Sequence, residues 1–188
     1  MAYGLKPARH GGGGAVRLNS FGQYTILSGY ATNLFRGDPV KRTADGTLIR
    51  DTAGSTMTVG VFWGVSYTDS STGEVKYSPY WPASTAATAI VAYVYDDPQI
   101  VFEVEADQDT TAITASDIGE YADLIVATGS LVNKVSGVSL DSNTIGTSIA
   151  QCMLLAPRTS DGLFATTVIN VEVIFAEHAL RQMPTATG

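Results

Sequence analysis

The side chains that most often carry catalysis are few and widely separated in this chain. His10 and His178 lie near opposite ends, and Cys152 is the one cysteine. A nucleophilic triad needs a histidine beside an activated serine, and no Gly-x-Ser-x-Gly turn occurs. Zinc needs several Cys or His ligands at short spacing. We therefore predict no triad and no zinc site. Cys152, among apolar neighbours, is expected to be a buried thiol, and His178 a surface or interface histidine at a strand end.

Carboxylates form the densest group of polar side chains, with six acids close together at Asp96, Asp97, Glu103, Glu105, Asp107 and Asp109. Calcium prefers several oxygen ligands on a turn. However, the alternating pattern of residues 99–106 places Glu103 and Glu105 on the solvent face of a strand. We interpret the group as a solvated acidic face. A calcium site, or a hydrolase built on two carboxylates from distant strands, stays as an alternative.

Aromatic side chains offer a second kind of binding chemistry. Tyr80 and Trp81 precede a proline and could stack on a sugar ring, although aromatic residues of this kind also fill cores and interfaces. A carbohydrate- or receptor-binding module that uses Tyr80 and Trp81 is therefore an alternative function. The tripeptide Arg36-Gly37-Asp38 spells an adhesion signal, but Gly-Asp-Pro is a common turn and we interpret it as one.

Composition excludes several classes of protein. Of 188 residues only 15% are charged, 45% are hydrophobic, and the formal net charge is −7. Disorder requires low hydrophobicity with high charge, and a protein that grips nucleic-acid phosphates requires a basic surface. No apolar run approaches the ~18 residues of a membrane span, and the first ten residues lack the apolar segment of a secretory leader. We expect a soluble protein made in the cytoplasm, with no nucleic-acid or membrane partner.

The elements that would position these side chains are mostly strands. Asp45-Gly46 and Thr72-Gly73 are hairpin turn signals. Met57, Val59, Val61, Trp63 and Val65 share one face at period 2. The expected strands are 24–27, 47–49, 56–67, 75–77, 90–95, 99–106, 122–127, 150–155 and 167–177. Strands at this spacing predict an all-β fold, an antiparallel β-sandwich or barrel that is jelly-roll-like.

The first 20 residues are expected to form an extended N-terminal arm. Pro7 and the tetraglycine 11–14 disfavour regular structure. The segment is locally basic on an acidic protein, with apolar anchors, so it is suited to lie on a partner. Its candidate contact residues are Tyr3, Lys6, Arg9 and Arg17. The predicted organisation is an arm at 1–20, a single β domain at 21–183 and a C-terminal tail at 184–188, with a merely flexible terminus as the alternative for the arm.

Several stretches, spread over most of the chain, resemble the same protein family. They are residues 3–7, 37–40, 60–65, 80–83, 96–104, 117–124, 137–141 and 168–178. Together they resemble the capsid decoration (cement, or head-stabilising) proteins of tailed bacteriophages, and the tetraglycine is a departure from that pattern. The resemblance implies a β-rich module bound outside the head shell, and it brings no catalytic residues.

The expected function follows from this resemblance. It is a structural virion protein on the outer capsid surface, made in the host cytoplasm, that clamps neighbouring major capsid subunits against internal DNA pressure. We expect no enzymatic activity, no cofactor and no metal. The expected partners are the major capsid protein and further copies of the chain, as a homotrimer in preference to a dimer.

Overall fold

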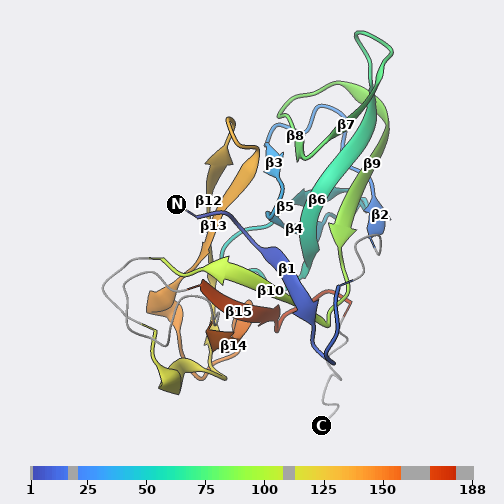
Figure 1. Cartoon of the computed structure of the whole chain (residues 1–188). Helices are drawn as coiled ribbons and strands as arrows, with labels where there is room; N and C mark the ends of the chain where they lie inside the picture. The colour runs from blue at the N-terminus through green and yellow to red at the C-terminus, as the bar shows by residue number, and fades with distance from the viewer. Residues whose placement is uncertain (1, 17–20, 108–112, 158–169, 181–188) are drawn as a thin grey trace.

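The chain forms an antiparallel all-β fold, which confirms the predicted fold class. The computed structural model describes residues 2–16, 21–107, 113–157 and 170–180. Its strands form two main sheets, consistent with a β-sandwich, and the described turns include two short 3₁₀ segments, η1 (Ala115–Asp117) and η2 (Ser142–Thr144). Figure 1 shows the two sheets at opposite ends of the molecule.

One sheet has six strands and is built around two predicted hairpins. Its order is β2 (Gly22–Tyr24), β9 (Ala87–Tyr95), β6 (Thr58–Asp69), β4 (Pro39–Arg42) and β5 (Leu48–Arg50), and β7 (Val75–Ser78) also pairs with β6. Asp45 and Gly46 turn the chain from β4 to β5, with Gly46 at φ +81°. Gly73, at φ +72°, does the same between β6 and β7. Both turns need a positive φ, which glycine adopts without steric cost.

The second sheet contains a strand from the N-terminal segment and strands from the C-terminal part of the chain. Its order is β1 (Lys6–His10), β10 (Ile100–Glu105), β15 (Asn170–Phe175), β14 (Cys152–Pro157) and β11 (Tyr121–Ala122). Two smaller pairs accompany it: the hairpin β12 (Leu124–Ser130)–β13 (Val135–Leu140), and β3 (Leu34–Phe35) with β8 (Tyr80–Trp81). In Figure 1 the β12–β13 hairpin projects beside the six-stranded sheet, with the N-terminus next to it.

Strand β6 contributes to two hydrophobic cores, and a bulge changes which of its residues face each core. Val61 packs in the core under the five-stranded sheet, whereas Phe62 and Val65 pack in the core of the six-stranded sheet. The register of β6 against β9 shifts between Phe62 and Gly64, and such a bulge reverses which face later residues occupy. The expected single face from Met57 to Val65 is therefore wrong, and Met57 itself is exposed.

Gly4 marks a tight crossing between the N-terminal segment and β13. It has φ +75°, and a Cβ built there would lie 2.5 Å from Ser136 Cβ. We expect Gly4→Ala to lower the free energy of unfolding by about 1–3 kcal/mol, measured by chemical denaturation, because the crossing cannot widen without moving β13. Gly13→Ala is the matched control, since Gly13 has φ +85° with nothing within 4 Å of the added Cβ. Equal losses in the two variants would show that backbone strain, and not the crossing, sets the cost.

Candidate functional site

The N-terminal segment lies on the chain's own sheet. Lys6–His10 pair with β10, and the side chain of Leu5 is buried in the core. Arg9 Nε donates to Glu172 Oε2 at 2.8 Å. Tyr3 Oη lies 2.6 Å from Asn170 Oδ1 and 2.9 Å from Glu103 Oε1. Tyr3, Leu5 and Arg9 thus have contacts within the same chain, and the expected contact of this segment with a partner stays a prediction.

Of the four predicted contact residues, Lys6 keeps the most open position. Its side chain is exposed, and Nζ lies 3.6 Å from the centre of the Tyr3 ring. Tyr3 and Arg9 are partly buried and already bonded, and Arg17 lies outside the described residues. Removing residues 1–20 would take away β1 and the core side chain of Leu5. Such a deletion would therefore perturb folding as well as binding.

A groove of about 340 Å³ separates residues 2 and 3 from the β12–β13 hairpin. At the tip of that hairpin, Leu131 is 58% exposed and Val132 is 88% exposed. We call Tyr3, Lys6, Leu131 and Val132 the hairpin–arm surface. Sequence reasoning missed the two apolar residues, although adjacent Leu and Val between Gly129-Ser130 and Asn133 are an available signal, since turns rarely need them.

Tyr80 and Trp81 have different environments. Trp81 is 0% exposed and packs edge-on against Tyr67, with ring centres 5.3 Å apart. It cannot stack on a sugar, so its assignment as an exposed ligand-binding aromatic is wrong. Successive side chains of a strand point to opposite faces, and only one face of β8 covers the core. Tyr80 is half-buried, stacked on Phe35, with Lys134 Nζ 4.1 Å from its ring centre.

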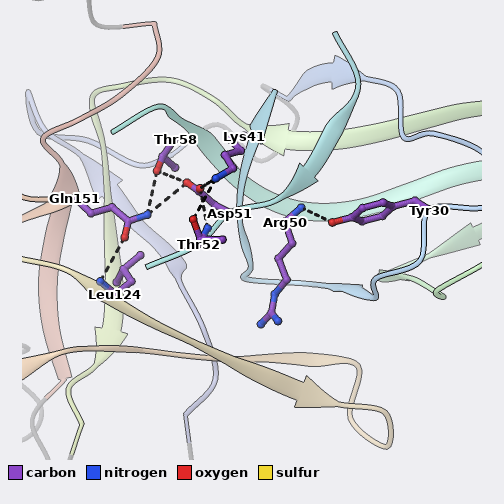
Figure 2. Close-up of polar contacts among 8 residues, drawn as sticks. All are labelled: Tyr30, Lys41, Arg50, Asp51, Thr52, Thr58, Leu124 and Gln151. Carbon is purple, nitrogen blue, oxygen red and sulfur yellow. Dashed lines mark hydrogen bonds and ion pairs between the residues drawn. The ribbon is translucent and has the colours of Figure 1, made fainter. Parts of the chain in front are cut away.

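A buried network, which we call the polar junction, joins Lys41, Asp51, Thr58 and Gln151 (Figure 2). Asp51 Oδ2 accepts from Thr58 Oγ1 at 2.6 Å and from Gln151 Nε2 at 3.4 Å. Lys41 Nζ lies 3.3 Å from Asp51 Oδ1. Gln151 Oε1 in turn accepts from the backbone N–H of Leu124 at 3.4 Å. The junction therefore links the six-stranded sheet to the part of the chain that precedes β14.

The polar junction is suited to holding structure and unsuited to proton transfer. The Asp51 carboxylate has donors on both oxygens, including the Thr52 N–H at 2.8 Å, so it has little capacity left to act as a base. An open pocket of about 420 Å³ lies beside it, lined in part by Tyr30, Arg50 and Val126. The Tyr30 hydroxyl there accepts from the Arg50 backbone N–H at 3.1 Å (Figure 2). Sequence spacing has no signal for this network, because its members lie far apart along the chain.

The Arg-Gly-Asp tripeptide is part of a turn, as interpreted from the sequence, with Arg36 exposed and Gly37 and Asp38 buried. Asp38 is fully buried and accepts from Phe35 N–H at 2.8 Å and Ser136 Oγ at 2.6 Å. Arg50 Nε lies 3.1 Å from Asp38 Oδ2 and its Nη2 also donates to the Ala127 carbonyl. Burial raises the pKa of Asp38 above its usual value, and the Arg50 guanidinium opposes that shift. These bonds tie the β12–β13 hairpin to β3 and β5.

The acidic group does not form a solvated face throughout. Glu105 is 7% exposed, and Val101 on the same side of β10 is fully buried. The expectation of a solvent face is therefore wrong for Glu105. The adjacent Ala106 forms a bridge with Leu140 of β13, so this end of β10 lies against a strand that is distant in the sequence. Within the described ranges, which exclude Asp109, no three His, Cys, Asp or Glu side chains are placed to hold a metal ion.

Cys152 and His178 are both buried. Cys152 is fully buried, as predicted, and this burial raises the pKa of its thiol well above the ordinary range. His178 is 5% exposed, so the expected surface position is wrong. Its ring packs against Phe175, with centres 6.2 Å apart, and Nδ1 accepts from Leu180 N–H at 3.1 Å. Residues 178–180, which follow β15, thus contact the core, which alternation within the strand cannot reveal.

Comparison with known proteins identifies no family for this chain. No family model, no curated protein and no solved structure matches the chain. Among the residues that the structure describes, no helix has the length and apolar character needed to cross a membrane. What the fold defines is an antiparallel all-β protein. Buried polar contacts tie its six-stranded sheet to the β12–β13 hairpin and to the segment that precedes β14.

Proposed function

We propose that this chain is a non-enzymatic virion protein that decorates the outside of a phage capsid and clamps neighbouring major capsid subunits. The observation that carries the proposal is the hairpin–arm surface. Leu131 and Val132 stand in water at the tip of a projecting hairpin, and the Lys6 side chain is exposed on the N-terminal segment, whose residues 2 and 3 line one groove with that hairpin. Apolar side chains presented in this way are typical of protein interaction sites.

Rigidity supports the proposal. A clamp transmits load only if its contact surface is fixed to the body of the protein. The β12–β13 hairpin is held to the six-stranded sheet by Asp38, Arg50 and Ser136, and to the polar junction through Leu124. Contacts of ordinary size, ~800 Å² per partner, become strong when one protein bridges several subunits. The positive charge of Lys6 favours an acidic shell surface.

The hairpin tip provides the test. We expect Leu131→Ser with Val132→Ser to weaken binding to emptied capsids of the encoding phage at least about tenfold, since two exposed apolar anchors are lost. Cosedimentation measures binding, and circular dichroism checks the fold. Met57→Ser is the matched control, because Met57 is an exposed apolar residue outside the surface.

Two results would contradict the proposal. The first is absence of the protein from purified virions by mass spectrometry. The second is equal resistance to heat and osmotic shock of particles made with and without it. Electron microscopy of the same particles would locate the added density on the outer shell.

The alternative function, carbohydrate or receptor binding, now depends on Tyr80 alone, since Trp81 is in the core. A glycan array comparing the wild type with Tyr80→Ala tests it. Sugar binding that Tyr80→Ala removes would favour this alternative over a purely structural role.

A further inference from the structure

Strand β7 is an open edge of the six-stranded sheet. It pairs with β6 and with no other strand among the described residues. Val75 and Tyr77, on one face of it, are 63% and 78% exposed. An edge strand offers unpaired backbone N–H and C=O groups to another chain, so its side chains and register decide what can pair with it.

The register shows which backbone groups of β7 are available. Asp69 N–H donates to the Glu74 carbonyl at 2.9 Å, and Thr68 lies opposite Val75. Hydrogen-bonded and non-hydrogen-bonded pairs alternate along antiparallel strands. Glu74, Lys76 and Ser78 therefore direct their backbone groups toward β6, whereas Val75 and Tyr77 direct theirs outward.

We propose that this edge binds a second copy of the chain, with the two β7 strands antiparallel about a two-fold axis at Val75. In that register each Glu74 lies opposite Lys76 of the other copy, in the close, non-hydrogen-bonded position. Two cross-strand ion pairs result from one symmetric contact. Shifting the axis to Lys76 would instead place the two Lys76 side chains opposite each other, so charge selects the Val75 register.

The apolar face of β7 completes the contact. The two Val75 side chains meet at the axis, and each Tyr77 extends toward the β6–β7 turn of the other copy, where Gly73 has no side chain to obstruct its ring. On the opposite face, Lys76 Nζ donates to Asp69 Oδ2 at 2.5 Å. This bond holds the Lys76 cation on the same face of the strand as Glu74. The strand is short, so the association is weak and depends on protein concentration.

This contact builds a dimer, whereas the sequence favoured a trimer. It does not rest on the proposed function, because a two-fold pair would form in free solution. If the chain also decorates a shell, the pairing edge and the hairpin–arm surface are different parts of the molecule, and each can be changed without the other.

Sedimentation velocity of the purified chain from about 1 to about 300 μM tests the proposal. We expect the weight-average mass to rise from 19.8 kDa toward twice that value. Val75→Lys places two like charges at the axis and should keep the chain monomeric. Val132→Lys, the same substitution at the exposed hairpin tip, should dimerise as the wild type does.

A second variant keeps the test decisive if Val75→Lys fails to fold by circular dichroism. The second variant is Glu74→Lys, at an exposed position. It converts both intermolecular ion pairs to repulsion between like charges and should weaken dimerisation about tenfold. A wild type that stays monomeric or forms trimers would overturn the proposal. So would dimerisation of both β7 variants at wild-type strength, or its loss in Val132→Lys alone.

Discussion

Asp38→Ala is expected to lower the free energy of unfolding by about 3–5 kcal/mol. Asp38 is fully buried, and its carboxylate faces the Arg50 guanidinium, the Phe35 N–H and the Ser136 hydroxyl. Removing it leaves the Arg50 cation with one partner fewer and two buried donors unsatisfied. The cost arises from these stranded groups, since the ion pair itself gains little over its desolvation.

Urea denaturation followed by circular dichroism measures this effect. Asp45→Ala is the matched control: Asp45 is an exposed acid in the β4–β5 turn, so its loss should change the unfolding free energy by less than about 0.5 kcal/mol. Asp38→Asn retains the size of the side chain and removes the charge. If Asp38→Ala were as harmless as Asp45→Ala, the hairpin would not depend on this contact for its attachment.

Trp81→Ala is expected to cost about 3–5 kcal/mol of unfolding free energy, because it empties the largest side-chain volume in the core of the six-stranded sheet. Tyr80→Ala, one residue away, removes a half-buried ring and should cost clearly less. Thermal melting of both variants gives the comparison. Similar losses would mean that the β3–β8 pair relaxes around the missing indole.

The contrast between Tyr80 and Trp81 also decides which variant can test ligand binding. A Trp81→Ala protein that loses sugar binding would be uninformative, because unfolding alone explains the loss. Tyr80→Ala changes a side chain that solvent reaches and leaves the core in place.

Local chemistry accounts for what was predicted correctly. Asp45-Gly46 and Thr72-Gly73 supply the positive φ of hairpin turns, and residues 170–175 alternate cleanly, so these features follow from neighbours in the chain. The burial of Cys152 followed in the same way from its apolar neighbours.

The errors share a different cause. Glu105 and His178 are polar residues whose burial depends on what packs over them. The face change within β6 depends on a bulge against β9, which alternation in β6 alone cannot show. The arm expected at positions 1–20 is a separate case: Lys6–His10 pair with β10, which alternation within the segment does not show, and its contact with a partner stays a prediction.

The sequence by itself determined the class of fold, because turn residues and period-2 patterns act over a few neighbouring positions. Only the tertiary structure decided the candidate surfaces. Leu131 and Val132 are exposed because the hairpin projects, and Val75 and Tyr77 because β7 ends its sheet. Asp51 and Gln151 form a hydrogen bond although they are a hundred positions apart in the sequence. Contacts of this kind arise from packing of distant segments, which spacing along the chain does not encode in any local pattern.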